Sequence, residues 1–114
     1  MIEYSFFIGR WQPWHDGHRW LIDQRLNEEK NICIAIQDRE TDKRNPFTAE
    51  QVKENINNEL KDLIELGRVK VIIIPAIESV NYGRKVGYEI NEFVPPDEIN
   101  DISATKIRSE LNLD

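Results

Sequence analysis

Short β-rich apolar runs alternate with helix signals along the first two thirds of the chain, and this alternation restricts the fold more than any other feature. The runs are Tyr4 to Ile8, Asn31 to Gln37 and Val69 to Ile74. Strands that alternate with helices favour right-handed crossovers and a parallel sheet. The sequence therefore predicts an α/β, Rossmann-like three-layer fold with a small, mostly parallel sheet.

Helix signals fill the intervals between these strands. Apolar residues at helical spacing predict one helix over His18 to Asn27, with Trp20 in the core. A second helix begins at Thr48-Ala49-Glu50-Gln51, which has the spacing of a capping box. Gly67 stands where a left-handed C-terminal cap belongs. Further along, we expect a short strand within Tyr88 to Val94 and a last helix over Ala104 to Leu111.

The size and charge of the chain limit the classes of function. Its 114 residues fit one domain, residues 1–114, and its net charge is −6. An acidic protein is poorly suited to duplex nucleic acid, because phosphate neutralisation drives that binding. No apolar run is long enough to span a bilayer, and no signal peptide is visible. We expect a cytoplasmic protein that binds neither nucleic acid nor membrane; whether it forms a homo-oligomer is left open.

The one cysteine, Cys33, lies inside the second apolar run. A free cysteine in such a run packs as a small hydrophobe, so we expect a buried thiol without a catalytic role.

The loop after the first strand is the expected ligand site, because ligands of open parallel sheets bind at the carboxyl ends of the strands. This loop leads into His15-Asp16-Gly17-His18 at the start of a helix. The free backbone N–H groups of a helix start favour a phosphate, and the two imidazoles add donors. Gly17 allows a close approach to the backbone, and the forked guanidinium of Arg10 suits phosphate oxygens.

The two histidines have two other interpretations, as metal ligands or as surface residues without a role. A zinc site needs three or four protein ligands, and the chain has only two histidines and one cysteine, so the two histidines lack further ligands to complete such a site. As surface residues without a role they would not be expected at the ligand-binding edge of the sheet. We therefore predict no metal held by protein side chains.

Three segments resemble motifs of the HxGH nucleotidyltransferase superfamily. Gly9 to His18 resembles the Gly-Arg-Phe-Gln-Pro-Phe-His-x-Gly-His signature, with Trp11 and Trp14 in place of the two phenylalanines. Asn45-Pro46-Phe47-Thr48-Ala49 resembles a segment of the archaeal-type nicotinamide-mononucleotide adenylyltransferases. Ile102 to Arg108 resembles the Ile-Ser-x-Thr-x-Ile-Arg signature near the carboxyl end of the same superfamily.

This resemblance implies a Rossmann-like fold and transfer of a nucleoside monophosphate from ATP or CTP to a phosphorylated small molecule. His15, His18 and Arg10 would contact the nucleotide phosphates, beside the backbone of Gly9 and Gly17. The carboxyl-terminal signature would hold the β- and γ-phosphates through Ser103, Thr105 and Arg108, with Lys106 as a further cation. Mg²⁺ is the implied cofactor, held mainly by the triphosphate.

The identity of the acceptor is left open. Only Ala76 to Asp101 lies between the third strand and the last signature, where the archaeal-type adenylyltransferases have another strand and helix. Tyr82 and Arg84 in this segment are candidates for contacts with the acceptor. Adenylyl transfer is preferred, cytidylyl transfer to a phosphorylated alcohol is one alternative, and a nucleotide-binding module without turnover is another. A dehydrogenase is disfavoured because no Gly-x-Gly-x-x-Gly follows the first strand.

Other residues near the expected site have two interpretations each. Trp11 and Trp14 either pack the loop, which we favour, or stack on a base. The cationic side chains of the loop after the second strand either cover a phosphate or are simply solvated; they are Arg39, Lys43 and Arg44.

Overall fold

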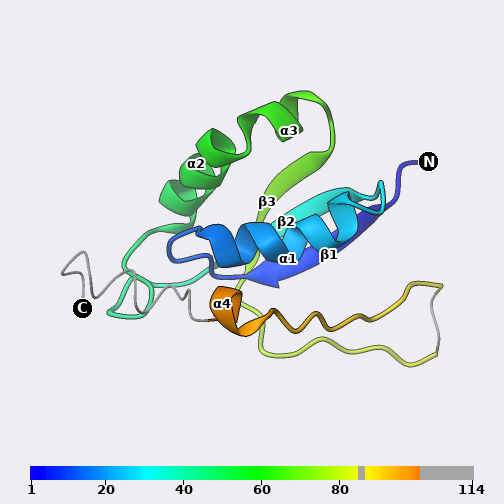
Figure 1. Ribbon diagram of the computed structural model, residues 1–114. Helices are drawn as coiled ribbons and strands as arrows, with labels where there is room; N and C mark the ends of the chain where they lie inside the picture. The colour runs from blue at the N-terminus through cyan, green and yellow to red at the C-terminus, as the bar shows by residue number, and fades with distance from the viewer. Residues whose placement is uncertain (85–86, 101–114) are drawn as a thin grey trace.

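The computed structural model describes residues 1–84 and 87–100 (Figure 1). Its elements in chain order are β1 (Tyr4–Gly9), α1 (Asp16–Leu26), β2 (Asn31–Asp38), α2 (Ala49–Glu59), α3 (Lys61–Glu65), β3 (Val69–Pro75) and α4 (Asp97–Asn100). The predicted last helix and the signature from Ile102 to Arg108 lie outside the described residues. None of the described helices is long and apolar enough to cross a membrane.

The described strands form one parallel sheet in the order β1-β2-β3. Ile8 of β1 lies opposite Ala35 of β2, and Ala35 lies opposite Ile72 of β3. The central strand is buried throughout from Ile32 to Ile36, as its continuous apolar run predicts. The predicted α/β class with a small parallel sheet is confirmed.

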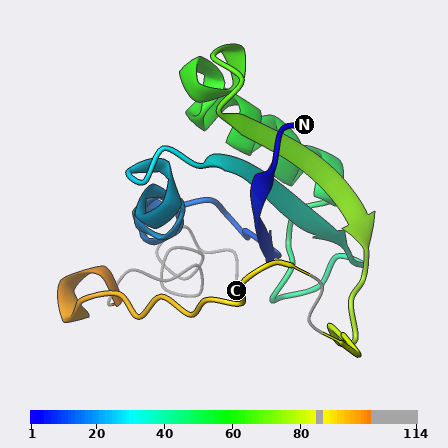
Figure 2. The ribbon, with the colours of Figure 1, turned by 90° about the vertical axis from the view of Figure 1, so that its right-hand side faces the viewer.

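Helices α1 and α2 cover the same face of this sheet (Figure 2). Ile22 of α1 and Ile56 of α2 pack in one cluster with Ile34 of β2, and all three side chains are fully buried. Burying an isoleucine side chain contributes roughly 1.5–3 kcal/mol, so this cluster is a main source of stability. Cys33 is buried, as expected. Trp20 is half-buried and lies outside the cluster, so its prediction as a core residue is wrong.

The opposite face of β1 is exposed, which corrects the expectation of a buried strand. Tyr4, Phe6 and Ile8 are 42%, 54% and 36% exposed, while the alternate residue Phe7 packs against the core. The cause is position: β1 is an edge strand of the described sheet, and both helices that follow β1 and β2 lie on the other face.

The second helix begins as predicted but ends earlier. The Thr48 side chain accepts a hydrogen bond from the backbone N–H of Gln51, and the Gln51 side chain accepts one from Thr48 N–H. Leu60, with φ −113° and ψ 21°, then separates α2 from α3, and its side chain is only 2% exposed. Gly67 has a φ of +74°, which confirms the predicted left-handed cap.

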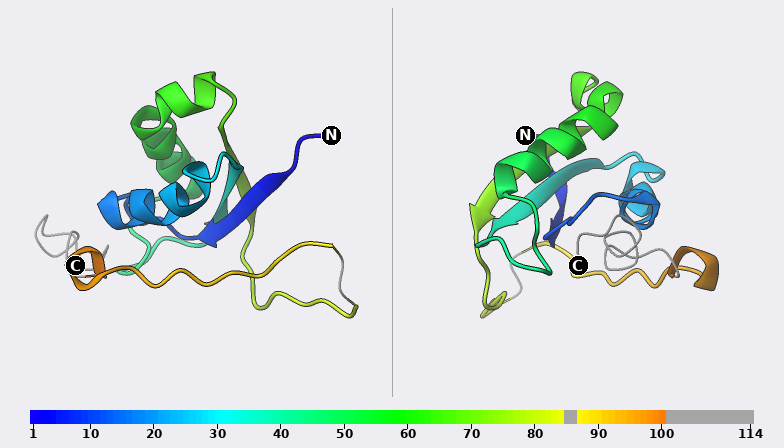
Figure 3. Two further views of the ribbon diagram at one scale, coloured as in Figure 1. Left: turned by 45° about the vertical axis from the view of Figure 1, so that its right-hand side comes forward. Right: turned by 90° about the vertical axis from the view of Figure 1, so that its left-hand side faces the viewer.

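The segment between β3 and α4 runs as an extended excursion without regular structure in its described residues (Figure 3). The short strand expected within Tyr88 to Val94 is wrong. Tyr88, Ile90 and Val94 are exposed and pair with no described strand, and Pro95-Pro96 lacks the N–H groups that a sheet ladder needs. The segment ends at α4, which lies against α1.

Candidate active site

Trp11 anchors the loop that joins β1 to α1. Its side chain is 5% exposed, and its Nε1–H donates to the carbonyl oxygen of Ala35 at 3.1 Å. Its backbone φ of 55° is left-handed, which costs a bulky residue about 1–2 kcal/mol. A Cβ atom on Gly9 would lie 2.7 Å from the Trp11 ring, so glycine is required there by the indole. The prediction that Trp11 packs the loop is confirmed.

Gln12 ties this loop to the segment before α2. Its side-chain Nε2 donates to the Phe47 carbonyl oxygen at 2.9 Å, and the Phe47 N–H donates to Gln12 Oε1 at 3.0 Å. Gln12 is only 6% exposed, so both bonds are shielded from water. The first two sequence motifs are therefore joined directly by paired hydrogen bonds.

His15 and His18 cap the amino end of α1 reciprocally. His15 is the N-cap residue, and its Nδ1 accepts from the Gly17 N–H at 3.0 Å. Nδ1 of His18 accepts from the His15 N–H at 3.2 Å. A neutral imidazole that accepts through Nδ1 carries its proton on Nε2. Each histidine is thus left with an Nε2–H donor.

Three aromatic rings border the His18 imidazole. The His15 ring stacks on it with centroids 3.7 Å apart and an angle of 19°. Trp11 meets it edge to face at 4.8 Å, and Trp14 lies tilted at 5.3 Å. This packing holds both imidazoles in a single arrangement at the helix start.

Burial keeps the two histidines neutral. Desolvation, followed by the adjacent His15, lowers the pKa of His18 from 6.5 to about 3. The pKa of His15 is also lowered by desolvation, against an opposing effect of Asp16. At neutral pH both rings are therefore hydrogen-bond donors through Nε2–H rather than cations.

The loop after β2 forms a closed turn beside this site. The Asp42 carboxylate accepts from the N–H groups of Arg44 and Asn45 and from the Asn45 side chain. These bonds, chiefly those from Asn45, lower the pKa of Asp42, and Arg10 contributes through its charge. Arg10, in the loop between β1 and α1, therefore lies close enough to this turn for its charge to act on the Asp42 carboxylate.

The cations of this loop have different surroundings. The Arg39 guanidinium donates to Gln37 Oε1 and to the Ile77 carbonyl oxygen, which holds it against the start of the excursion after β3. Lys43 and Arg44 are exposed on the closed turn. Contact of these side chains with a phosphate stays a prediction.

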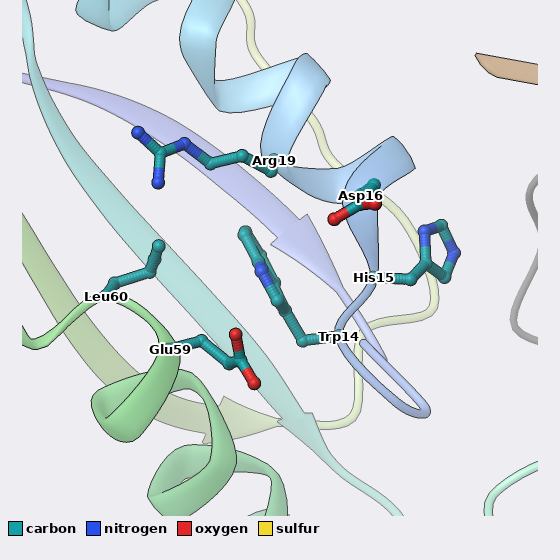
Figure 4. A pocket seen from close by; sticks show the side chains of 6 residues that line it. All are labelled: Trp14, His15, Asp16, Arg19, Glu59 and Leu60. Atoms are coloured by element: carbon teal, nitrogen blue, oxygen red, sulfur yellow. The ribbon is translucent and has the colours of Figure 1, made fainter.

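A pocket of about 260 Å³ opens beside the histidines, between α1 and the end of α2 (Figure 4). It is lined by Trp14, His15, Asp16, Arg19, Glu59 and Leu60. The Trp14 ring stands between the two helices in this view. Arg19 is paired with Asp23 at 2.8 Å, so its charge is partly neutralised within α1.

The structure places five of the predicted site residues between the carboxyl end of β1 and the first turn of α1: Gly9, Arg10, His15, Gly17 and His18. Tyr82 and Arg84 lie exposed on the excursion after β3, which leads away from the amino end of α1 (Figures 1 and 3). Their contact with an acceptor stays a prediction. Ser103, Thr105, Lys106 and Arg108 lie outside the described residues, and their roles also stay predictions.

Two buried polar residues of this region were missed at the sequence level. Gln12 was not singled out because its partner, Phe47, is 35 residues away. Asn45 is 5% exposed and donates to Asp42 Oδ1 at 3.0 Å, whereas its own Oδ1 has no partner among the described residues. The Asn-Pro before a capped helix signals a turn but not this burial.

Comparison with known proteins gives a consistent set of relatives, although no family model matches the chain. A nicotinamide-nucleotide adenylyltransferase from Methanocorpusculum labreanum is 32% identical over 94 residues, which are 81% of this chain and 53% of the relative. One from Saccharolobus solfataricus is 36% identical over 76 residues, 64% of the chain and 44% of the relative. One from Halobacterium salinarum is 43% identical over 47 residues, 40% of the chain and 27% of the relative.

The chain spans about half the length of the curated relatives it matches. The similarity agrees with the motif at Gly9 to His18 and with the parallel α/β fold. Together, these observations show that the chain is similar, over most of its own length, to the archaeal nicotinamide-nucleotide adenylyltransferases.

Proposed function

We propose that this protein transfers the adenylyl group of ATP to a phosphorylated small molecule and releases pyrophosphate. The observation that carries the proposal is the reciprocal capping of α1 by His15 and His18, which leaves an Nε2–H donor on each ring. The names of the relatives support ATP as the nucleotide.

The chemistry requires alignment and charge stabilisation rather than a covalent nucleophile. An oxygen of the acceptor phosphate attacks the α-phosphorus, and the bond between that phosphorus and the α,β-bridging oxygen breaks. The acceptor is already anionic, so no general base is needed. Preorganised donors stabilise the charge that develops on the α-phosphate oxygens. His15 and His18 supply such donors, and the backbone N–H groups at the start of α1 add positive potential.

The leaving group needs cations of its own. We assign the β- and γ-phosphates to Ser103, Thr105 and Arg108, with Lys106 beside them, on the basis of the carboxyl-terminal motif. Arg10 is exposed just after β1, and we assign it a further contact with the triphosphate. Two sets of donors suit a ligand that carries charge along its length.

Magnesium fits this arrangement as an ion carried by the substrate. No group of three acidic, histidine or cysteine side chains in residues 1–84 and 87–100 is placed to hold a metal. Triphosphate oxygens and water would therefore provide its ligands, and the ion would neutralise charge on the transferred and leaving phosphates.

The acceptor is proposed as a nucleotide-type phosphate. The relatives are named for nicotinamide nucleotide, so that compound is the first acceptor to test. Tyr82 and Arg84 are the proposed contacts, since an aromatic ring and a guanidinium suit a base and a phosphate.

The test is incubation with each of the four nucleoside triphosphates, Mg²⁺ and a panel of phosphorylated metabolites, scored by pyrophosphate release. We expect release with ATP in the presence of nicotinamide nucleotide, and its loss in His18→Ala. Preferential use of CTP would indicate cytidylyl transfer instead. Nucleotide binding without release on any acceptor would indicate a nucleotide-binding module and overturn the proposal.

A further inference from the structure

Trp11 joins the central strand of the sheet to the imidazole of His18. At one end its Nε1–H is bonded to the Ala35 carbonyl oxygen of β2, 24 residues away in sequence. At the other end its ring meets the His18 ring edge to face, with centroids 4.8 Å apart. The side chain is 5% exposed, so this link has little freedom to move.

The backbone around Trp11 is arranged to keep the indole in this place. Trp11 adopts a φ of 55°, a conformation that bulky residues rarely occupy unless their surroundings impose it. Gly9 leaves space for the ring, because a Cβ atom there would lie 2.7 and 2.8 Å from two of its carbon atoms. Unfavourable backbone conformations of this kind concentrate where a loop must be held in one functional geometry.

We propose that Trp11 is a positioning residue for catalysis: its hydrogen bond to Ala35 holds the indole, and the indole holds the His18 ring in the orientation in which Nδ1 accepts from the His15 N–H. This inference rests on the proposed adenylyl transfer. Trp11 does not contact the reacting phosphates in this account; it acts through the imidazole that does.

The indole nitrogen is the part of Trp11 that a merely space-filling residue would not need. The superfamily motif that this segment resembles has phenylalanine at this position, and phenylalanine has no donor for Ala35. A phenylalanine ring would fill most of the same volume but would lack the hydrogen bond to Ala35 that fixes the orientation of the indole. The hydrogen bond therefore separates positioning from packing in an experiment.

The test compares Trp11→Phe and Trp11→Leu with Trp20→Phe as the matched control. Trp20 lies on α1, half-buried and outside the core cluster. Misplacement of a catalytic group by about 1 Å lowers rates on the order of a hundredfold. We expect kcat to fall about tenfold in Trp11→Phe and about a hundredfold in Trp11→Leu, while KM for ATP stays within about twofold. Trp20→Phe should match the wild type.

A second measurement does not depend on turnover. Nitrogen-15 NMR of the histidine rings reports the tautomer and the titration of His18, whose titratable neighbour is His15. In the wild type and in Trp20→Phe, His18 should keep its proton on Nε2 and stay neutral down to pH 5. In Trp11→Leu its pKa should rise toward 6.5, because the ring becomes more hydrated, and the tautomers should mix.

The two readouts separate the failure of this proposal from failure of the proposed function. If the wild type shows no turnover, adenylyl transfer is wrong, yet the NMR comparison still tests whether Trp11 orients His18. If folded Trp11→Leu retains the wild-type His18 spectrum, or if its kcat equals that of Trp20→Phe, Trp11 is only a core residue and the positioning role is refuted.

Discussion

Lowering the pH from 8 to 5 is expected to destabilise the protein through His18. The pKa of this imidazole is about 3 in the folded protein, chiefly because burial removes it from water, and 6.5 is its ordinary value. In the unfolded chain His18 takes up a proton as the pH falls through 6.5. In the folded protein it stays neutral, because its Nδ1 accepts the His15 N–H and its ring is packed among aromatic side chains.

The sign and size follow from proton linkage. Because the unfolded state binds more protons between pH 3 and 6.5, the free energy of unfolding falls as the pH decreases through this window. At pH 5 the contribution of His18 alone is a loss of about 2 kcal/mol relative to pH 8. Since pH 5 lies well above the folded-state pKa, this loss is set almost wholly by the unfolded-state value.

Urea denaturation followed by circular dichroism at several pH values measures this effect, and His18→Gln is the control. Glutamine at this position of a capping box can accept the His15 N–H as the imidazole does, but it does not titrate. From pH 8 to pH 5 the free energy of unfolding should fall about 2 kcal/mol more in the wild type than in the variant. Equal pH dependence in the two proteins would refute the buried, neutral state of His18.

Three further predictions concern activity and local stability. His18→Ala should lower kcat for pyrophosphate release by about 10²–10³ while the circular dichroism spectrum is retained, because a donor to the transition state is lost; near wild-type turnover would remove His18 from the mechanism. Arg108→Ala should raise KM for ATP and slow transfer, with Arg108→Lys restoring activity only in part because lysine cannot make the forked contact; unaltered ATP kinetics would exclude a phosphate contact. Thr48→Ala should lower the free energy of unfolding by about 1 kcal/mol, because it removes the acceptor for the Gln51 N–H, whereas Thr48→Ser should be close to wild type in urea denaturation.

Local signals in the sequence predicted most of the fold. The capping box at Thr48 and Gln51 and the left-handed conformation of Gly67 each depend on only a few neighbouring residues. The structure has both features, as predicted. The exposure of Phe6 is different, because it depends on what packs over β1 rather than on β1 itself. The break at Leu60 likewise reflects tertiary packing, since the apolar pattern continues through it.

The sequence predicted where His15 and His18 lie in the fold but not the contacts that these residues make. The position of His15 and His18 after the first strand indicated a phosphate site, and the same His-x-x-His spacing is also that of an N-cap and N3 pair, which was not recognised. The bonds from Trp11 to Ala35 and from Gln12 to Phe47 join residues 24 and 35 positions apart. Local patterns carry no information on such pairs.

The most direct test of the central claim is to follow which phosphorus of ATP reaches the acceptor. The protein is incubated with Mg²⁺, nicotinamide nucleotide and ATP radiolabelled at either the α- or the γ-phosphorus, with His18→Ala as the control. Adenylyl transfer predicts that the α-label appears in the condensed product and the γ-label in pyrophosphate, both reduced about 10²-fold or more in the variant. Transfer of the γ-label to the acceptor, or an α-label that remains entirely in ATP with every acceptor tested, would contradict it.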